Sequence, residues 1–150
     1  MRDQSAALKA LASDARAGAR GAVLLAGAAG GAGARAAETL AADLRTTVYR
    51  IDLGATVSKY IGETEKHLDA VFTEAERAAA VLLLDEADAL FGKRTGVKDA
   101  HDRYANLDMS ALLVRIEQYQ GVALLATNPG TNIDPAFTRR LRRVIDYTPR

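Results

Sequence analysis

The chain has 150 residues, of which 49% are hydrophobic and 26% are charged, and its formal net charge is +1. This length suits one globular domain with a core of its own, and the small net charge argues against a nucleic acid as the main partner. The sequence contains no cysteine and therefore no disulfide, and no apolar run approaches the roughly 18 residues that a membrane span needs.

Helical and extended patterns alternate along the chain, which predicts a parallel sheet with helices on both faces. An alanine-rich helix is expected over residues 5–17. Strands are expected at 22–26, 47–52, 81–85, 122–127 and 143–147, and helices at 34–44, 63–79, 102–119 and 134–139. The helices at 63–79 and 102–119 each carry an apolar stripe of helical period, so we expect both stripes to face the core.

The most informative segment is residues 81–94, where two acids directly follow a strand. Four aliphatic residues predict a strand that is buried on both faces, and Asp85 and Glu86 then lie at its carboxyl end. Ligands of open α/β sheets bind at that edge. Two adjacent acids suit divided roles, one holding a metal ion through water and the other polarising an attacking water. The plainer alternative is that the pair only caps the strand end.

A glycine-rich turn after the first strand has the frame of a phosphate loop, whose pattern is G-x-x-x-x-G-K-[ST]. Counting from Gly27 places Gly33 at the lysine position and Ala34 at the hydroxyl position. A one-residue insertion would instead place Ala34 at the lysine position and Arg35 one step late. Neither register supplies both a lysine and a hydroxyl, although the backbone N–H groups and the helix N-terminus still attract an anion. The residues expected around a phosphate are Gly27, Gly30, Gly31, Ala32, Gly33, Ala34 and Arg35.

Four segments, in this order and with comparable spacing, resemble motifs of the AAA+ ATPases, within the AAA clade proper. They are a Walker B strand in LLLDEADALF, a first pore loop in SKYIGETEKHL, a sensor strand in GVALLATNPG and an arginine-finger segment in IDPAFTRRLRR. One such match would be weak, but four in order are strong. The resemblance covers about residues 21–148 and implies a doubly wound, three-layer α/β fold with sheet order 5-1-4-3-2. The glycine-rich turn then corresponds to a degenerate Walker A loop.

The resemblance also implies a role for each matching residue. Asp85 would hold Mg²⁺ through water, Glu86 would be the catalytic base, and Asn128 would help to orient the water. Arg142 is the first candidate for the arginine finger and Arg139 the second, and either would act on the site of a neighbouring subunit. The residues that would touch a protein substrate are Lys59, Tyr60, Ile61 and Gly62.

Plainer interpretations of the same residues stay open. By composition alone, Tyr60 is an ordinary exposed aromatic residue, and Asn128 is a typical turn residue before Pro129. The arginine cluster can equally be a solvated, weakly paired surface. His67 and His101 have no partner pattern, and we expect both to be plain residues of a helix surface.

The chain departs from the family in two respects. Losing the loop lysine and hydroxyl removes two or three charge-assisted hydrogen bonds, which costs on the order of 3–6 kcal/mol, or roughly 10²–10⁴ in nucleotide affinity. The helical lid that usually follows the core is also expected to be absent, because the sequence ends just after the last strand. We therefore expect a single domain over residues 1–150, with 1–20 as an N-terminal helix and linker.

The function implied is the ATPase core of a ring-forming machine that remodels or unfolds protein substrates. Its cofactors would be ATP or ADP with Mg²⁺, and its partners would be self or sister subunits, in a hexamer, within the cytoplasm. The altered loop predicts that ATP binding and hydrolysis are impaired. The alternative is a non-hydrolysing subunit or scaffold, although the retained Asp85, Glu86 and Asn128 favour recent loss or alteration of an ATPase loop. A small-molecule kinase is disfavoured, because it has no use for pore-loop and arginine-finger segments.

Overall fold

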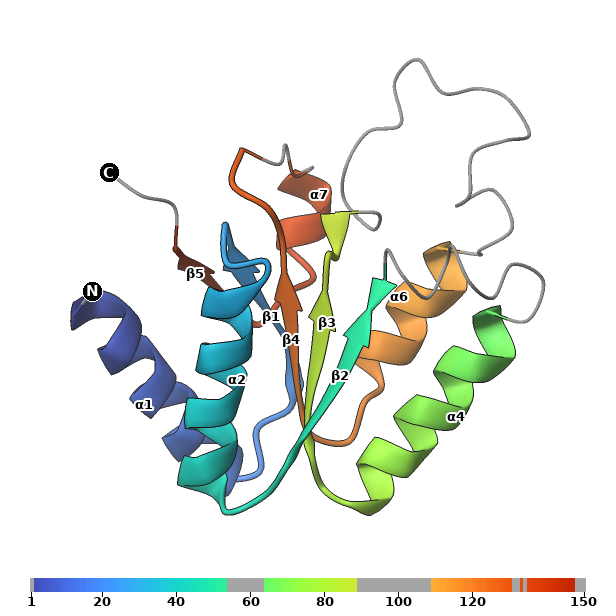
Figure 1. Ribbon diagram of the computed structural model, residues 1–150, viewed down its shortest axis with the longest axis horizontal. Helices are drawn as coiled ribbons and strands as arrows, with labels where there is room; N and C mark the ends of the chain where they lie inside the picture. Colours follow the sequence, from blue (N-terminus) through green and yellow to red (C-terminus); the bar gives the residue numbers. More distant parts are fainter. Residues whose placement is uncertain (1, 54–63, 89–108, 131–132, 134, 148–150) are drawn as a thin grey trace.

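The computed structural model describes residues 2–53, 64–88, 109–130, 133 and 135–147 (Figure 1). The helices are α1 (Arg2–Arg16), α2 (Gly31–Leu44), α4 (Thr64–Arg77), α6 (Met109–Glu117) and α7 (Pro135–Thr138). The strands are β1 (Gly21–Ala26), β2 (Val48–Asp52), β3 (Val81–Asp85), β4 (Val122–Ala126) and β5 (Arg143–Asp146). None of these helices is long and apolar enough to cross a membrane.

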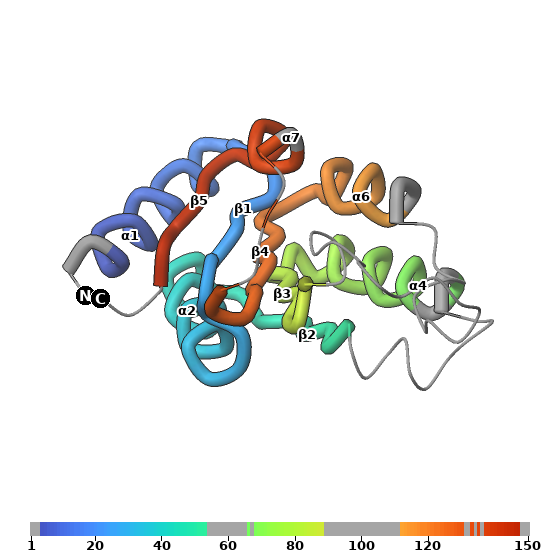
Figure 2. The backbone as a smooth tube through the Cα atoms, turned by 90° about the horizontal axis from the view of Figure 1, so that it is seen from above, coloured from blue at the N-terminus to red at the C-terminus, as the bar shows by residue number. Residues whose placement is uncertain are grey.

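The five strands form one parallel sheet in the order β2-β3-β4-β1-β5, which confirms the predicted order 5-1-4-3-2. Helices α1 and α2 cover one face of the sheet, and α4 and α6 cover the other (Figures 1 and 2). The central strands β3 and β4 are buried along their whole length. Their continuous aliphatic runs are what a strand covered on both faces requires.

Alternate residues of each strand feed two separate apolar layers. In β1, Val23 and Leu25 pack with the helices α1 and α2, while Leu24 packs with α4 and α6. In the second layer, the rings of Phe72 and Tyr119 meet edge to face, with centroids 6.1 Å apart. This alternation fixes the register of the sheet, because a slip of one residue would exchange the two layers.

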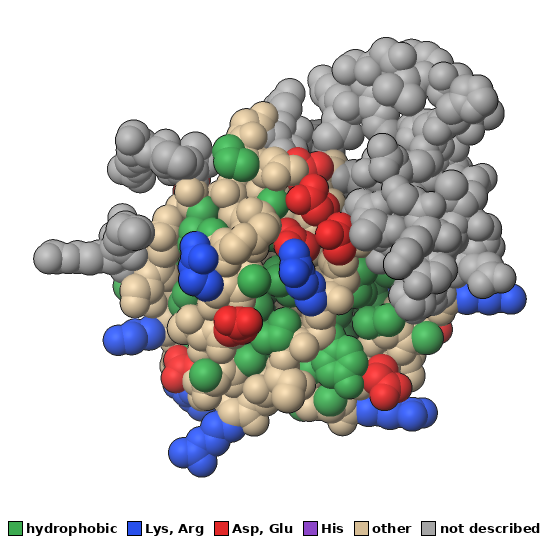
Figure 3. Space-filling view, viewed as in Figure 1, with side chains coloured by type: hydrophobic (Ala, Val, Ile, Leu, Met, Phe, Trp, Pro, Cys, Tyr) green, Lys and Arg blue, Asp and Glu red, His purple; other side chains and the backbone are tan. Residues whose placement is uncertain are grey.

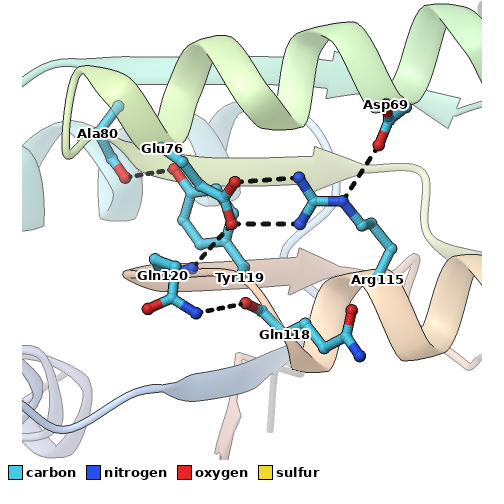
Figure 4. A network of polar contacts seen from close by, with 7 residues as sticks. All are labelled: Asp69, Glu76, Ala80, Arg115, Gln118, Tyr119 and Gln120. Carbon is cyan, nitrogen blue, oxygen red and sulfur yellow. Dashed lines mark hydrogen bonds and ion pairs between the residues drawn. The ribbon is translucent and has the colours of Figure 1, made fainter.

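A polar network joins α4 to α6 at the edge of the second apolar layer (Figure 4). The Arg115 guanidinium donates to both carboxylate oxygens of Glu76, at 3.0 and 3.2 Å, and to Asp69 at 3.3 Å. These bonds from Arg115 hold the pKa of Glu76 below its usual value. The Tyr119 hydroxyl donates to the Ala80 carbonyl at 2.8 Å, and burial raises the pKa of this phenol.

Helix α2 begins earlier than the sequence predicts, at Gly31 instead of residue 34. Its first turn consists of glycine and alanine, which carry no helix-start signal of their own. Gly30 precedes the helix with a φ of 86°, a left-handed conformation that favours glycine. The glycine-rich turn is therefore short, and the N-terminus of α2 lies close to the carboxyl edge of the sheet.

Candidate functional site

The acid pair lies at the carboxyl end of β3, as the sequence predicts. Asp85 is fully buried, with 0% of its surface exposed, whereas Glu86 is partly exposed. Glu86 has a left-handed φ of 58°, so the backbone turns sharply out of the sheet at this residue. Figure 3 shows acidic side chains gathered at this end of the molecule, with a basic side chain beside them. Two adjacent carboxylates thus meet different surroundings.

Asn128 follows the neighbouring strand β4 and lies beside Glu86. Its Nδ2 group donates to Glu86 Oε1 at 3.4 Å and to Asp88 Oδ2 at 3.3 Å. The backbone N–H of Asn128 also donates to the Asp88 carboxylate, at 3.2 and 3.3 Å. The amide and the Glu86 carboxylate are therefore close enough to share one bound water, and Asp88 fixes the position of the amide.

Asp85 accepts hydrogen bonds from three donors of different elements. The Gly30 N–H lies 3.1 and 3.3 Å from its two oxygens, and the Glu86 N–H lies 3.0 Å from Oδ1. The Arg50 guanidinium, from β2, lies 2.5 Å from Oδ2. The carboxylate thus connects the glycine-rich turn, the end of β3 and the edge strand β2.

The glycine-rich turn is held down on the end of β4. The N–H of Gly27 donates to Thr127 Oγ1 at 3.3 Å, and the N–H of Ala29 donates to the Thr127 carbonyl at 2.9 Å. Across the turn, the Gly33 N–H donates to the Ala28 carbonyl at 2.5 Å. Several N–H groups that a phosphate loop would direct at its ligand are therefore bonded within the chain itself.

Gly33 is buried, and the surrounding atoms leave no space for a side chain there. A Cβ on Gly33 would lie 2.7 Å from the Ala28 carbonyl oxygen and 3.1 Å from Ala126 Cβ. Gly31, by contrast, is exposed, and a Cβ there would meet only the end of the Arg35 side chain, at 3.1 Å from Nη1. Arg35 therefore lies over the first turn of α2, where it contributes positive charge outside the turn.

This arrangement provides few ligands for a nucleotide-bound Mg²⁺ ion. A hydrated magnesium ion needs oxygen ligands, and Ala34 provides no hydroxyl. A metal-bound water at Asp85 would compete with the three donors that this carboxylate already has. In the described part of the chain there is also no group of three or more His, Cys, Asp or Glu residues that could hold a metal ion.

Three of the four arginines near β5 are bound within the chain, in pairs that connect distant elements. Arg140 donates twice to the Glu117 carboxylate at the end of α6, at 2.7 and 2.8 Å, which raises the arginine pKa. Arg142 donates to Asp14 of α1 at 2.9 Å, and Arg143 lies 3.6 Å from the same carboxylate. Arg142, our first candidate for the finger, is thus engaged by its own chain.

Arg139, the second candidate, is exposed and much less engaged. Its Nε group lies 3.5 Å from the Pro135 carbonyl, a long and weak contact. Among the described residues, none of these arginines bonds to Asp85 or Glu86, which is what a group acting on a neighbouring subunit requires. This comparison favours Arg139 over Arg142.

The predicted pore-loop residues Lys59, Tyr60, Ile61 and Gly62 lie outside the described residues, as does His101, and the side chain of His67 is not described either. Their roles stay predictions.

Three residues near the acid pair were not predicted from the sequence. Arg50 lies in an exposed position of an edge strand, where a charged residue usually faces water. Asp88 is the last residue of the segment Asp-Glu-Ala-Asp at 85–88, and its position three residues after Asp85 is the feature of the sequence that could have indicated a role. Thr127 directly follows an apolar strand, and its burial to 1% exposed indicates that its hydroxyl is bonded inside.

Comparisons with known proteins agree with this geometry. The sequence model described as "ATPase family associated with various cellular activities (AAA)" matches residues 23–149. The AAA family ATPase y4kL of Sinorhizobium fredii is 30% identical over 109 residues, covering 73% of this chain and 33% of the relative. The proteasome-activating nucleotidase of Aeropyrum pernix is 31% identical over 117 residues, covering 73% of this chain and 29% of the relative. The chain thus spans about a third or less of these relatives' length.

Among solved structures, the crystal structure of the FIGL-1 AAA domain matches 97% of this chain and 52% of that chain, with a TM-score of 0.73. At 22% sequence identity this match concerns the fold alone. It agrees with the parallel five-stranded sheet and the strand order described above.

Proposed function

Because the chain belongs to the AAA family of ATPases, as its sequence predicts, we propose that it is the α/β domain of a protein-remodelling machine whose own nucleotide site is impaired. The family binds nucleotides and typically uses Mg²⁺, so ATP or ADP with Mg²⁺ is the proposed ligand. Hydrolysis would fall to Glu86 as base, with Asn128 orienting the water. The proposed location is the cytoplasm.

The observation that carries the proposal is the contrast between the two halves of the site. In the part of the site that would activate water, Asn128 Nδ2 lies 3.4 Å from Glu86 Oε1, and Asp88 accepts a second hydrogen bond from the same amide. The part of the site that would hold phosphate has neither the lysine nor the hydroxyl of a phosphate loop. Its turn is closed by the hydrogen bond from the Gly33 N–H to the Ala28 carbonyl. Such a site favours an ATPase whose affinity for nucleotide is reduced over a protein of the same fold that never hydrolysed ATP.

The proposed partners are self or sister subunits of a ring and a protein substrate. Support for a protein substrate comes from similarity to a proteasome-activating nucleotidase. Support for subunits that complete one another's sites comes from Arg139, which is exposed and away from the acid pair of its own chain. Tyr60 and its neighbours would contact the substrate. The competing proposal is a non-hydrolysing subunit that keeps only the fold and the interface.

The test is a calorimetric titration of Mg-ATP into the unmodified chain, together with a phosphate-release assay at rising protein concentration. We expect no binding in the micromolar range and negligible turnover. The matched control is Glu86→Gln, which removes the proposed base and keeps the loop. Micromolar binding, with a turnover that Glu86→Gln abolishes, would show that the site is active and not impaired. Micromolar binding without turnover would instead favour the non-hydrolysing subunit.

A further inference from the structure

The Asp85 carboxylate already has a cation, and that cation is a side chain of the same molecule. We propose that Arg50 is the resident counter-ion of Asp85, in the place where the family resemblance puts a metal ion. The pair then joins the glycine-rich turn to the sheet without any bound ligand. This inference concerns the unliganded chain and does not depend on whether it hydrolyses ATP.

The contacts of Asp85 show why it needs a counter-ion. Its side chain is 1% exposed, and a buried carboxylate is stable only when it is paired and hydrogen-bonded. Gly30 and Glu86 supply neutral N–H donors, and only Arg50 among the described contacts supplies a positive charge. Because the Arg50 side chain is half exposed, its far edge stays in water while one Nη group reaches the buried carboxylate.

The register of β2 against β3 strengthens this requirement. Asp52 is paired with Asp85 across the two parallel strands, and Arg50 is paired with Leu83. Residues two apart in a strand share one face, so both carboxylates and the guanidinium lie on the same face of the sheet. Like charges on neighbouring strands destabilise a sheet. A cation on this face therefore reduces the repulsion between the two carboxylates, also when no nucleotide is present.

The pair also affects the glycine-rich turn. Asp85 accepts the Gly30 N–H, which is one of the backbone groups that a phosphate loop would offer to its ligand. As long as Arg50 neutralises Asp85, this N–H has a satisfied acceptor inside the chain. A metal ion or its bound water at Asp85 would compete with the guanidinium for this carboxylate.

The experiment measures thermal unfolding in Mn²⁺ and in EDTA, without nucleotide, because Mn²⁺ is a hard cation that a free carboxylate can bind. The unmodified chain should unfold at the same temperature in both. Arg50→Gln should unfold several degrees lower in EDTA, and Mn²⁺ should restore part of the loss. Arg50→Gln combined with Asp85→Asn should be more stable than Arg50→Gln alone and should not respond to Mn²⁺. Arg77→Gln, at an exposed position of α4, is the matched control and should change nothing.

Failure of Mn²⁺ to stabilise Arg50→Gln, or equal stabilisation of the double variant, overturns the proposal. If Arg50→Gln does not fold, two other measurements decide. Arg50→Lys keeps the charge and should fold with no response to Mn²⁺. In NMR spectra with equimolar Mn²⁺, the amides of Gly30 and Glu86 should broaden equally in the unmodified chain and in Asp85→Asn, whereas greater broadening in the unmodified chain would place a metal at Asp85 and contradict us. Because no nucleotide is added, these outcomes do not depend on ATP binding or hydrolysis.

Discussion

Counted from Gly27, position 33 has glycine where the phosphate-loop pattern requires lysine, and the neighbouring backbone leaves no space for a side chain there. The Ala28 carbonyl lies 2.7 Å from where a Cβ would be. We therefore expect Gly33→Ala to destabilise the protein by about 1–3 kcal/mol, through overpacking against the backbone. Gly31→Ala is the matched control, because it meets only the end of a flexible arginine and adds helix propensity. It should be neutral or stabilising by up to roughly 1 kcal/mol. Equal effects in urea unfolding would contradict this account of Gly33.

The close approach of the Ala28 carbonyl to Gly33 also determines the effect of restoring the phosphate-loop side chains. The variant Ala32→Gly, Gly33→Lys, Ala34→Thr supplies the missing side chains, but its lysine has to displace the Ala28 carbonyl. Without nucleotide it should unfold at a lower temperature than the unmodified chain. Mg-ATP should raise its unfolding temperature, since a ligand at 100 times its Kd contributes about 2.7 kcal/mol. The unmodified chain should show no such rise. No response of the variant would mean that the loop is not the limiting defect or that the register is wrong.

The sequence predicts some site residues and misses others for a physical reason. Asp85 and Glu86 are predictable because they end a buried apolar strand, and Asn128 because it ends the next one. Arg50 is not predictable in this way, because its role depends on which strands are neighbours. Asp88 is not predictable either, because its role depends on how the backbone turns after β3. The pairing of β2 with β3 is part of the tertiary structure, and a local sequence pattern does not determine it.

At the scale of elements, the strands were predicted closely and the start of α2 was not. Continuous aliphatic runs such as that of β3 belong to strands buried on both faces, so their position and parallel arrangement follow from the pattern. Helix α2 starts three residues before the predicted position because glycine and alanine give no start signal, and the helix extends to Gly31 after the left-handed Gly30. The helix expected at 102–119 is described only from Met109 onward, where it agrees.

The junction of α4 with α6 should make stability depend on pH. Bonds from Arg115 lower the pKa of Glu76 from its ordinary 4.5. A carboxylate whose pKa is lower in the folded state stabilises the fold above its unfolded pKa, and this contribution disappears as the pH falls through the folded value. Glu76→Gln should therefore cost about 1–2 kcal/mol at pH 7 and progressively less below about pH 4. Urea unfolding at several pH values measures this, with Glu74→Gln, at an exposed position of the same helix, as control. A constant difference at all pH values would argue against the pair.

At the scale of the whole molecule, the arginines near β5 divide into structural and available groups. Arg142 joins the C-terminal strand region to α1 through Asp14, and Figure 2 shows α1 and β5 side by side. Arg142→Ala should therefore lower the unfolding temperature modestly, because exposed ion pairs contribute little. Within the described part of the chain, Arg139 has only its long contact with the Pro135 carbonyl, so we expect any role it has to concern another molecule. The unmodified chain is expected to be monomeric, since nucleotide normally holds such subunits together.

A mixing experiment tests whether Arg139 acts on a neighbouring subunit. It uses two variants that both carry the loop changes Ala32→Gly, Gly33→Lys and Ala34→Thr. One also carries Arg139→Ala, which leaves its base intact and removes its finger. The other carries Glu86→Gln, which removes its base and leaves its finger intact. If Arg139 acts across a subunit boundary, each variant alone should hydrolyse ATP negligibly, and the mixture should recover turnover because the second supplies its arginine to the first. The recovery should rise with total protein concentration. A third variant, which combines the repaired loop with Arg142→Ala, should hydrolyse ATP as fast as the repaired chain and should only be less stable. Full turnover by the Arg139→Ala variant alone would show that Arg139 is not the finger.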